Sequence, residues 1–196
     1  WNAPVDVPNH PRIACEAAIK MMIALEALNQ DLIGSERITQ PLKIGIGLNT
    51  GEVTVGNLGS EQRFDYSCLG DAINLGSRLE GLSKAYGVPI VIGESTYDVL
   101  DHPPTDAEVV LLDHVIVKGK SIPVAIYGII PHKHFSIDWC ADHNELMKFI
   151  DHEAWEDVEL VLERLRVSET YPVELLDQAI YRAENKISEV RQMTTK

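Results

Sequence analysis

Two side chains suited to binding phosphates and sugars stand four residues apart near the middle of the chain. Asn74 offers an amide and Arg78 a guanidinium, and Ser67 adds a hydroxyl a few residues earlier. If the segment from Asp71 onward is a helix, Asn74 and Arg78 are i, i+4 neighbours that point to the same side. A strand that leads into a helix with an amide and a guanidinium on one face is suited to gripping a phosphorylated sugar.

The segment before these residues predicts the strands that position them. From residue 44 to 48, apolar side chains alternate with Gly45 and Gly47. This pattern predicts a strand whose glycine face lets another element approach closely. Asn49-Thr50-Gly51 has the composition of a turn, and the alternation resumes over residues 53–55. We therefore expect a hairpin between these two runs.

A second alternating run and a helix follow. Residues 64–68 alternate again, and Asp71 has the properties of a helix N-cap. After it, apolar residues recur at helical spacing and predict one stripe that faces the core: Leu75, Leu79, Leu82 and Tyr86.

Three segments together resemble the class III nucleotidyl cyclases, which make cyclic AMP or cyclic GMP. YSCLGDAINLGSRLE, residues 66–80, is similar to the signature of that family. GIGLNTGEVTVGNLG, residues 45–59, and VKGK, residues 117–120, resemble the neighbouring family motifs in the same order. The resemblance covers roughly residues 1–130, and several linked motifs agree.

The resemblance implies an α/β (α+β) fold with a ferredoxin-like core. We expect residues 1–131 to form the cyclase domain, N-terminally incomplete because it lacks the strands with the metal-binding aspartates. Residues 132–196 are expected to form a linker and a helical tail similar to TPR-like extensions. The family forms head-to-tail homodimers with active sites across the interface, which implies the same assembly here.

The resemblance also implies roles for single residues. Asn74 would orient the ribose, and Arg78 would stabilise charge on the α-phosphate as the 3′-hydroxyl attacks it. Ser67 occupies the position that reads the purine, where adenylyl cyclases often carry aspartate or threonine. Lys118 matches the lysine that contacts the terminal phosphates, and Lys120 is a second candidate.

Each of these residues also has a simpler interpretation. Asn74 can be an ordinary first-turn helix residue, and Arg78 a surface partner of a nearby glutamate. Ser67 can be a strand hydroxyl that bonds to the backbone, and the residues favour this interpretation about as much as the functional one. For Asn74 and Arg78 the motif context favours the functional role.

Metal ligands are expected outside this sequence. The family uses two divalent ions, Mg²⁺ or Mn²⁺, held by two aspartates that the resemblance places upstream of Trp1. A histidine and cysteine group lies at His132, His134, Cys140 and His143, but its spacing fits no standard zinc pattern. We therefore expect a polar linker there and no metal in this chain.

The resulting hypothesis is an enzyme that converts ATP to cyclic AMP and pyrophosphate in intracellular signalling. The alternatives are a non-catalytic regulatory module that binds nucleotide or a partner, and a guanylyl cyclase. Because the chain resembles only part of the family domain, we expect it to be inactive alone and active in an intact parent.

Composition narrows the partners and the compartment. The 196 residues carry a formal net charge of −13, which argues against nucleic acid or an anionic membrane as a partner. Three irregularly spaced cysteines suit a reducing cytoplasm. No apolar run approaches the roughly 20 residues of a membrane span, although an anchor upstream remains compatible with the sequence.

The remaining periodicity predicts alternating helices and strands. A helix over 12–30, with Met21 and Met22 on its core face, precedes the central motif. After that motif we expect a buried strand within VPIVIGEST and a short helix capped by Ser95. We then expect strands at 109–117 and 122–130, and helices at 144–150, 153–169 and 173–191.

Overall fold

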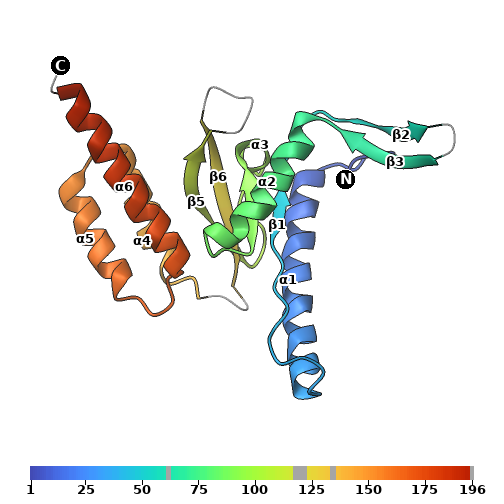
Figure 1. Cartoon of the computed structure of the whole chain (residues 1–196), viewed down its shortest axis with the longest axis horizontal. Helices are drawn as coiled ribbons and strands as arrows, with labels where there is room; N and C mark the ends of the chain where they lie inside the picture. Colours follow the sequence, from blue (N-terminus) through green and yellow to red (C-terminus); the bar gives the residue numbers. More distant parts are fainter. Residues whose placement is uncertain (61–62, 117–122, 133–135, 195–196) are drawn as a thin grey trace.

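Short apolar runs of the sequence form a four-stranded sheet in the computed structural model of the chain (Figure 1). The order across the sheet is β1 (Ile46–Leu48), β4 (Ile90–Gly93), β6 (Val124–Pro131) and β5 (Ala107–Val115). β1 runs parallel to β4, and the other neighbours are antiparallel. The structure describes all residues except 61–62, 117–122, 133–135 and 195–196.

Helices cover both faces of this sheet. Successive side chains of a strand point to opposite faces, and in β4 the side chains on both faces are apolar. Ile90 and Ile92 of β4 pack in the core beside α1 (His10–Gly34), whereas Val91 lies in the core beside α2 (Asp71–Ala85). The predicted stripe of α2 is confirmed: three of its four residues are buried and the fourth, Leu82, packs against them.

α1 is longer than predicted and is only partly covered. Cys15 and Ile19 are buried against the sheet, and Met22 packs beside them. Met21 is exposed, so the expectation that both methionines lie in the core is wrong for one of them. Consecutive residues on a helix point about 100° apart, which places only one of the pair on the buried side.

The hairpin lies elsewhere than predicted. β2 (Thr54–Ser60) and β3 (Arg63–Leu69) pair as a two-stranded antiparallel arm that projects away from the sheet (Figure 1). The predicted pairing of residues 44–48 with 53–55 is therefore wrong. β1 instead takes β4 as a parallel partner, and its apolar residues, which are partly buried, pack in the core that includes α1. Alternation identifies a strand but does not select its partner.

Two predicted helix caps are also wrong. Gly70, not Asp71, occupies the N-cap position of α2, and Gly93, not Ser95, precedes α3 (Glu94–Tyr97). Neither helix has a side-chain cap hydrogen bond. Asp71 lies in the first turn of α2, where its carboxylate stabilises the helix through the helix dipole.

Three helices follow the sheet: α4 (Cys140–Asp151), α5 (Trp155–Arg166) and α6 (Val173–Thr194). Their buried residues, among them Leu146, Leu165 and Leu175, share one hydrophobic core with α2 and the sheet. The predicted class, α/β with a helical C-terminal appendage, is confirmed. The domain division at residue 131 and the likeness of the tail to TPR-like repeats stay predictions.

None of the helices in the described part of the chain is long and apolar enough to span a bilayer.

Candidate nucleotide site

The glycine face of β1 brings α2 unusually close to the sheet. A Cβ on Gly47 would overlap the backbone of α2 at Gly76 and Glu80, and one on Gly45 would overlap the hydroxyl of Ser83. These overlaps confirm the predicted close approach of another element to this strand. The position of α2 is therefore determined by backbone contact, which leaves little freedom for the helix to shift.

The N-terminal end of α2 is also tied to the loop after β1. Asn49 Nδ2 donates a hydrogen bond of 3.2 Å to the carbonyl oxygen of Ala72 in the first turn. In the same loop, the hydroxyls of Thr50 and the buried Thr96 lie 2.9 Å apart. This loop follows β1 and contacts both α2 and α3, so it holds the first turn of α2 in place.

Asn74 and Arg78 lie on that outer face. Both are exposed, whereas Leu75 and Leu79, the residues that follow each of them, are buried. The i, i+4 spacing therefore places the amide and the guanidinium on the same solvent side of a firmly seated helix. Both side chains are therefore open to solvent.

A groove of about 550 Å³ lies beside the start of α2, between the helix, the β2–β3 arm and the N-terminal segment. Ser67 lines it and is exposed, opposite Gly56 on the neighbouring strand. Ile73 and Ser77 line it from α2. Asn74 and Arg78 stand on the adjacent strip of the helix and do not line the groove.

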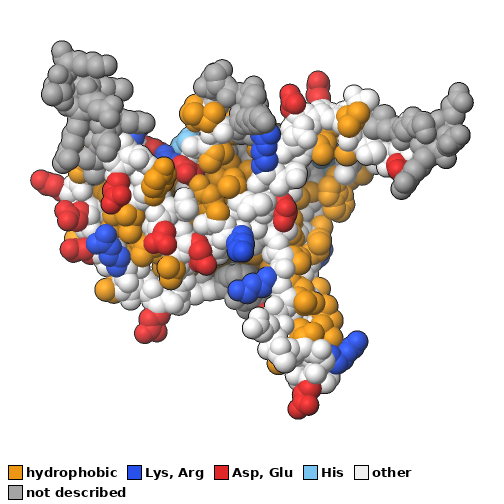
Figure 2. Space-filling view, in the orientation of Figure 1, with side chains coloured by type: hydrophobic (Ala, Val, Ile, Leu, Met, Phe, Trp, Pro, Cys, Tyr) orange, Lys and Arg blue, Asp and Glu red, His pale blue; other side chains and the backbone are white. Residues whose placement is uncertain are grey.

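Apolar side chains surround this region. Figure 2 shows them along α1 and near the base of the arm, and Tyr66, Leu69 and Ile73 are among those with more than a third of their surface exposed. An exposed apolar patch beside a groove is typical of an interaction surface.

The sequence profile of the family described as "Adenylate and Guanylate cyclase catalytic domain" matches residues 3–131. The chain belongs to this family.

Named cyclases are among its relatives and structural neighbours. It is 38% identical over 117 residues to "Adenylate cyclase, terminal-differentiation specific" of Dictyostelium discoideum, a match that covers 60% of this chain and 5% of that protein. The guanylyl cyclase Cya2 has a similar structure, with 31% identity, a TM-score of 0.55, and coverage of 68% of this chain and 66% of that one.

The adenylyl cyclase CyaB from P. aeruginosa is about equally similar. It shares 30% identity and a TM-score of 0.56, over 67% of this chain and 65% of that one. The chain therefore spans about two thirds of each of these cyclase structures and a small part of the Dictyostelium protein. The neighbours include both an adenylyl and a guanylyl cyclase, so likeness alone does not distinguish ATP from GTP.

Two predicted site residues of this cyclase domain, Lys118 and Lys120, lie outside the described residues. Their proposed contact with phosphates stays a prediction, as do the roles of Ser67, Asn74 and Arg78.

The described residues provide no group of three or more His, Cys, Asp or Glu side chains placed to hold a metal ion. The described surroundings of Asn74 and Arg78 thus do not fit the two divalent ions that the family implies. The expectation that the metal ligands lie outside this sequence stays a prediction.

Sequence reasoning missed Asn49 as a residue that anchors α2 and Thr50 as one that contacts α3. Asn49 Oδ1 is buried, and no hydrogen-bond partner for it is found among the described residues. The composition of Asn49-Thr50-Gly51 indicated only a turn, because a turn motif does not reveal which helix its side chains reach.

The expected polar linker around the histidines is wrong for Cys140 and His143. His143 is fully buried on α4: one ring nitrogen lies 2.6 Å from the Tyr171 hydroxyl and the other 2.7 Å from the Leu111 carbonyl oxygen. Since the carbonyl only accepts, Nε2 donates to Leu111 and Nδ1 accepts from Tyr171. Burial lowers the pKa of His143 to about 4, despite the opposing effect of the Leu111 carbonyl.

Proposed function

We propose that the protein containing this chain is an adenylyl cyclase, which converts ATP to 3′,5′-cyclic AMP and pyrophosphate. The observation that carries the proposal is the pair Asn74 and Arg78, exposed one turn apart on α2 inside the family signature. Backbone contacts with β1 hold that helix in place. Preorganised donors of this kind suit a reaction whose main demand is the positioning and neutralisation of developing charge.

The proposed reaction assigns a distinct task to each side chain. The Asn74 amide hydrogen-bonds the ribose and aligns its 3′-hydroxyl with the α-phosphorus. The Arg78 guanidinium compensates the charge that grows on the α-phosphate oxygens as the bond to pyrophosphate breaks. Ser67 contacts the purine from the groove, and Lys118 and Lys120 bind the terminal phosphates.

The proposed enzyme acts as a head-to-tail homodimer in the cytoplasm, with Mg²⁺ or Mn²⁺ as its metal. This chain then supplies one half of each shared site. The exposed apolar side chains around the arm support such an assembly, because they would be covered by a partner. The three cysteines are free, as expected in a reducing compartment.

The experiment is a complementation assay in the intact protein. Asn74→Ala combined with Arg78→Ala should lower kcat by roughly a thousandfold or more, since loss of a single transition-state donor costs about 10²–10³. The matched control is Lys84→Ala, an exposed cation on the same helix, which should keep its activity. A second inactive variant would lack the proposed metal-binding aspartates.

Mixing the two inactive variants should restore part of the activity, because one site of each mixed dimer then has both functional halves. Mixed dimers that form but stay inactive would contradict the shared site. Nucleotide binding without turnover in the unmodified protein would favour the regulatory module instead.

Substrate choice is the finer part of the proposal. We expect a higher kcat/KM for ATP than for GTP, with weak discrimination. A serine hydroxyl contributes a single hydrogen bond of roughly 0.5–1.5 kcal/mol, equivalent to about tenfold at most. The neighbouring guanylyl cyclase structure makes GTP the specific alternative, and faster turnover of GTP would establish it.

A further inference from the structure

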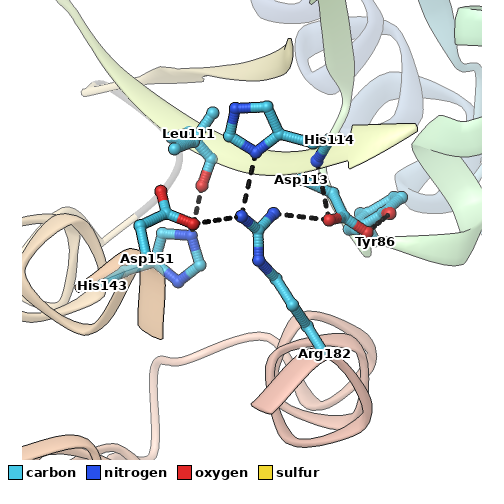
Figure 3. A network of polar contacts seen from close by, with 7 residues as sticks. All are labelled: Tyr86, Leu111, Asp113, His114, His143, Asp151 and Arg182. Carbon is cyan, nitrogen blue, oxygen red and sulfur yellow. Dashed lines mark hydrogen bonds and ion pairs between the residues drawn. The ribbon is translucent and has the colours of Figure 1, made fainter. Parts of the chain in front are cut away.

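Arg182 on α6 connects the helical tail to the sheet at several points (Figure 3). Its Nη1 donates to Asp113 Oδ1 on β5 at 2.5 Å, and its Nη2 donates to Asp151 Oδ1 at the end of α4 at 2.6 Å. Nη2 also lies 2.9 Å from Nδ1 of His114, which therefore accepts. Only 14% of the Arg182 side chain is exposed, so this network is more strongly held than an ordinary surface ion pair.

Asp113 also forms a hydrogen bond with the residue that ends α2. Its Oδ2 accepts a 2.8 Å hydrogen bond from the hydroxyl of Tyr86, the residue at the C-terminal end of α2. Oδ1 accepts from the backbone N–H of His114 as well as from Arg182. The carboxylate is thus shared between one residue of the tail and one residue of the helix that carries Asn74 and Arg78.

Tyr86 is held by packing as well as by this bond. The residue is 4% exposed and lies in the core shared with the tail. Burial, together with the Asp113 carboxylate, raises the pKa of the Tyr86 hydroxyl far above its usual value, so it stays a donor at any physiological pH. The bond to Asp113 therefore persists unless Asp113 itself moves.

A second contact lies next to this bond. Gly87, directly after α2, has φ +65°, and a Cβ there would lie 3.2 Å from Cβ of Pro172 and 3.3 Å from Cβ of Glu174. The chain leaving α2 thus turns against the beginning of α6, where the left-handed backbone favours glycine. This contact of Gly87 and the bond from Tyr86 to Asp113 lie at the same end of α2.

We propose that Arg182 is a positioning residue that sets the orientation of α2 through Asp113 and Tyr86. This proposal rests on the proposed function, because it is through Asn74 and Arg78 that the orientation would affect catalysis. α2 is tied at its first turn by Asn49 and at its end by Tyr86. Through Arg182 and Asp113 the tail therefore supports one of the contacts that hold this helix, in addition to its backbone contacts with β1.

The geometry explains why the loss of one anchor would affect catalysis more than binding. Arg78 lies eight residues before Tyr86, about 12 Å along the helix at a rise of about 1.5 Å per residue. The backbone contacts of Gly76 and Glu80 with β1 then act as a pivot: if the C-terminal end of α2 is released, the helix rotates slightly about them and the end of the long Arg78 side chain moves by up to about 1 Å. Misplacement on that scale can cost as much as 100-fold in rate while substrate still binds.

The test uses Arg182→Gln and Tyr86→Phe in the intact protein, singly and together. Each single variant should lower kcat about tenfold and change KM by less than twofold. The double variant should lose no more than the stronger single variant, because both remove the same connection. Arg182→Lys keeps one bond to Asp113 and should restore part of kcat. The matched control is Arg164→Gln, which removes another arginine of the tail that forms two ion pairs, with Asp142 and Glu145.

Amide hydrogen exchange gives a readout that does not depend on activity. In Arg182→Gln and Tyr86→Phe, exchange should accelerate in the last turn of α2 and stay unchanged in β4, whereas Arg164→Gln should change neither. Equal acceleration in all elements would indicate general destabilisation and overturn the positioning role. Unchanged kcat in an active protein, or additive losses in the double variant, would overturn it as well.

The outcome also separates this inference from the proposed function. If the unmodified protein makes no cyclic nucleotide, the proposed function fails, but the exchange experiment still decides whether Arg182 holds α2. Unchanged exchange in Arg182→Gln would then refute the connection.

Discussion

The two edges of the sheet are built in opposite ways. At the β5 edge, two side chains of α4 form hydrogen bonds with the backbone of Leu111. Asn144 Oδ1 accepts from its N–H at 3.3 Å, and His143 donates to its carbonyl oxygen at 2.7 Å. The register between β5 and β6 shifts between Leu111 and Asp113, next to this contact. At the β1 edge, a strand of three residues lies between α1 and α2, beside the groove that Ser67 lines.

This difference shows how stability and binding are divided within the domain. An edge strand offers backbone groups that other chains can pair with, and covering it with a helix removes that hazard. The β5 edge is covered in this way, and its buried polar groups bond to one another. The β1 side instead keeps Asn74 and Arg78 exposed on a firmly seated helix, with Ser67 exposed on the arm beside it.

The largest expected change in stability comes from a substitution that disturbs the tight packing between β1 and α2. Gly47→Ala should destabilise the protein by about 3 kcal/mol or more, since the new Cβ meets backbone atoms of α2 that cannot move aside as a side chain can. Urea unfolding of the variant measures this loss. The control is Gly56→Ala on β2, where a Cβ would meet nothing within 4 Å. Equal stability of the two variants would show that α2 is not held by this contact.

The next effect concerns the β5 edge and depends on pH. The pKa of His143 is about 4 in the folded protein, against 6.5 as the ordinary value. Between these values the unfolded chain binds a proton that the folded one does not, so stability falls as pH drops from about 6.5 to 4. The loss is on the order of 3 kcal/mol for this residue, at 1.36 kcal/mol per pKa unit.

The measurement compares the pH dependence of the unfolding free energy in the unmodified protein and in His143→Gln. Glutamine can still bond to Tyr171 and Leu111 but does not titrate, so this variant should show a flatter dependence between pH 6.5 and 4. An identical slope in both proteins would mean that His143 is protonated in the folded state.

The smallest expected change in stability comes from a substitution on the exposed face of α2. Gly81 lies in this helix and is exposed, and a Cβ added there would meet no atom of the described residues within 4 Å. Gly81→Ala should therefore stabilise the protein by about 0.5–1 kcal/mol through helix propensity alone. A thermal shift experiment detects the change. A loss of stability would mean that this part of α2 has a neighbour which the isolated chain does not include.

Much of the fold and part of the site follow from local sequence patterns. The stripe of α2, the glycine face of β1 and the three helices of the tail depend on periodicity, which neighbouring residues determine among themselves. The exposure of Asn74 and Arg78 follows in the same way, because the stripe that buries Leu75 and Leu79 leaves both on the outer side.

Other features were beyond sequence reasoning because they depend on residues far apart in the chain. The partner of β1 is β4, more than 40 residues later, and alternation predicts a strand without its partner. His143 looked like part of a polar linker, yet its burial depends on Tyr171 and Leu111, 28 and 32 residues away.

Local patterns were therefore enough to identify the family, most of the helices and strands, and the side of α2 that meets solvent. The pairing of the strands, the anchoring of α2 and the link from the tail to α2 through Arg182 and Asp113 depend on the folded chain. The difference lies in the range of the interactions. Periodicity acts within one or two turns of the chain, whereas Arg182 and Asp113 are 69 residues apart and meet only when the core has formed.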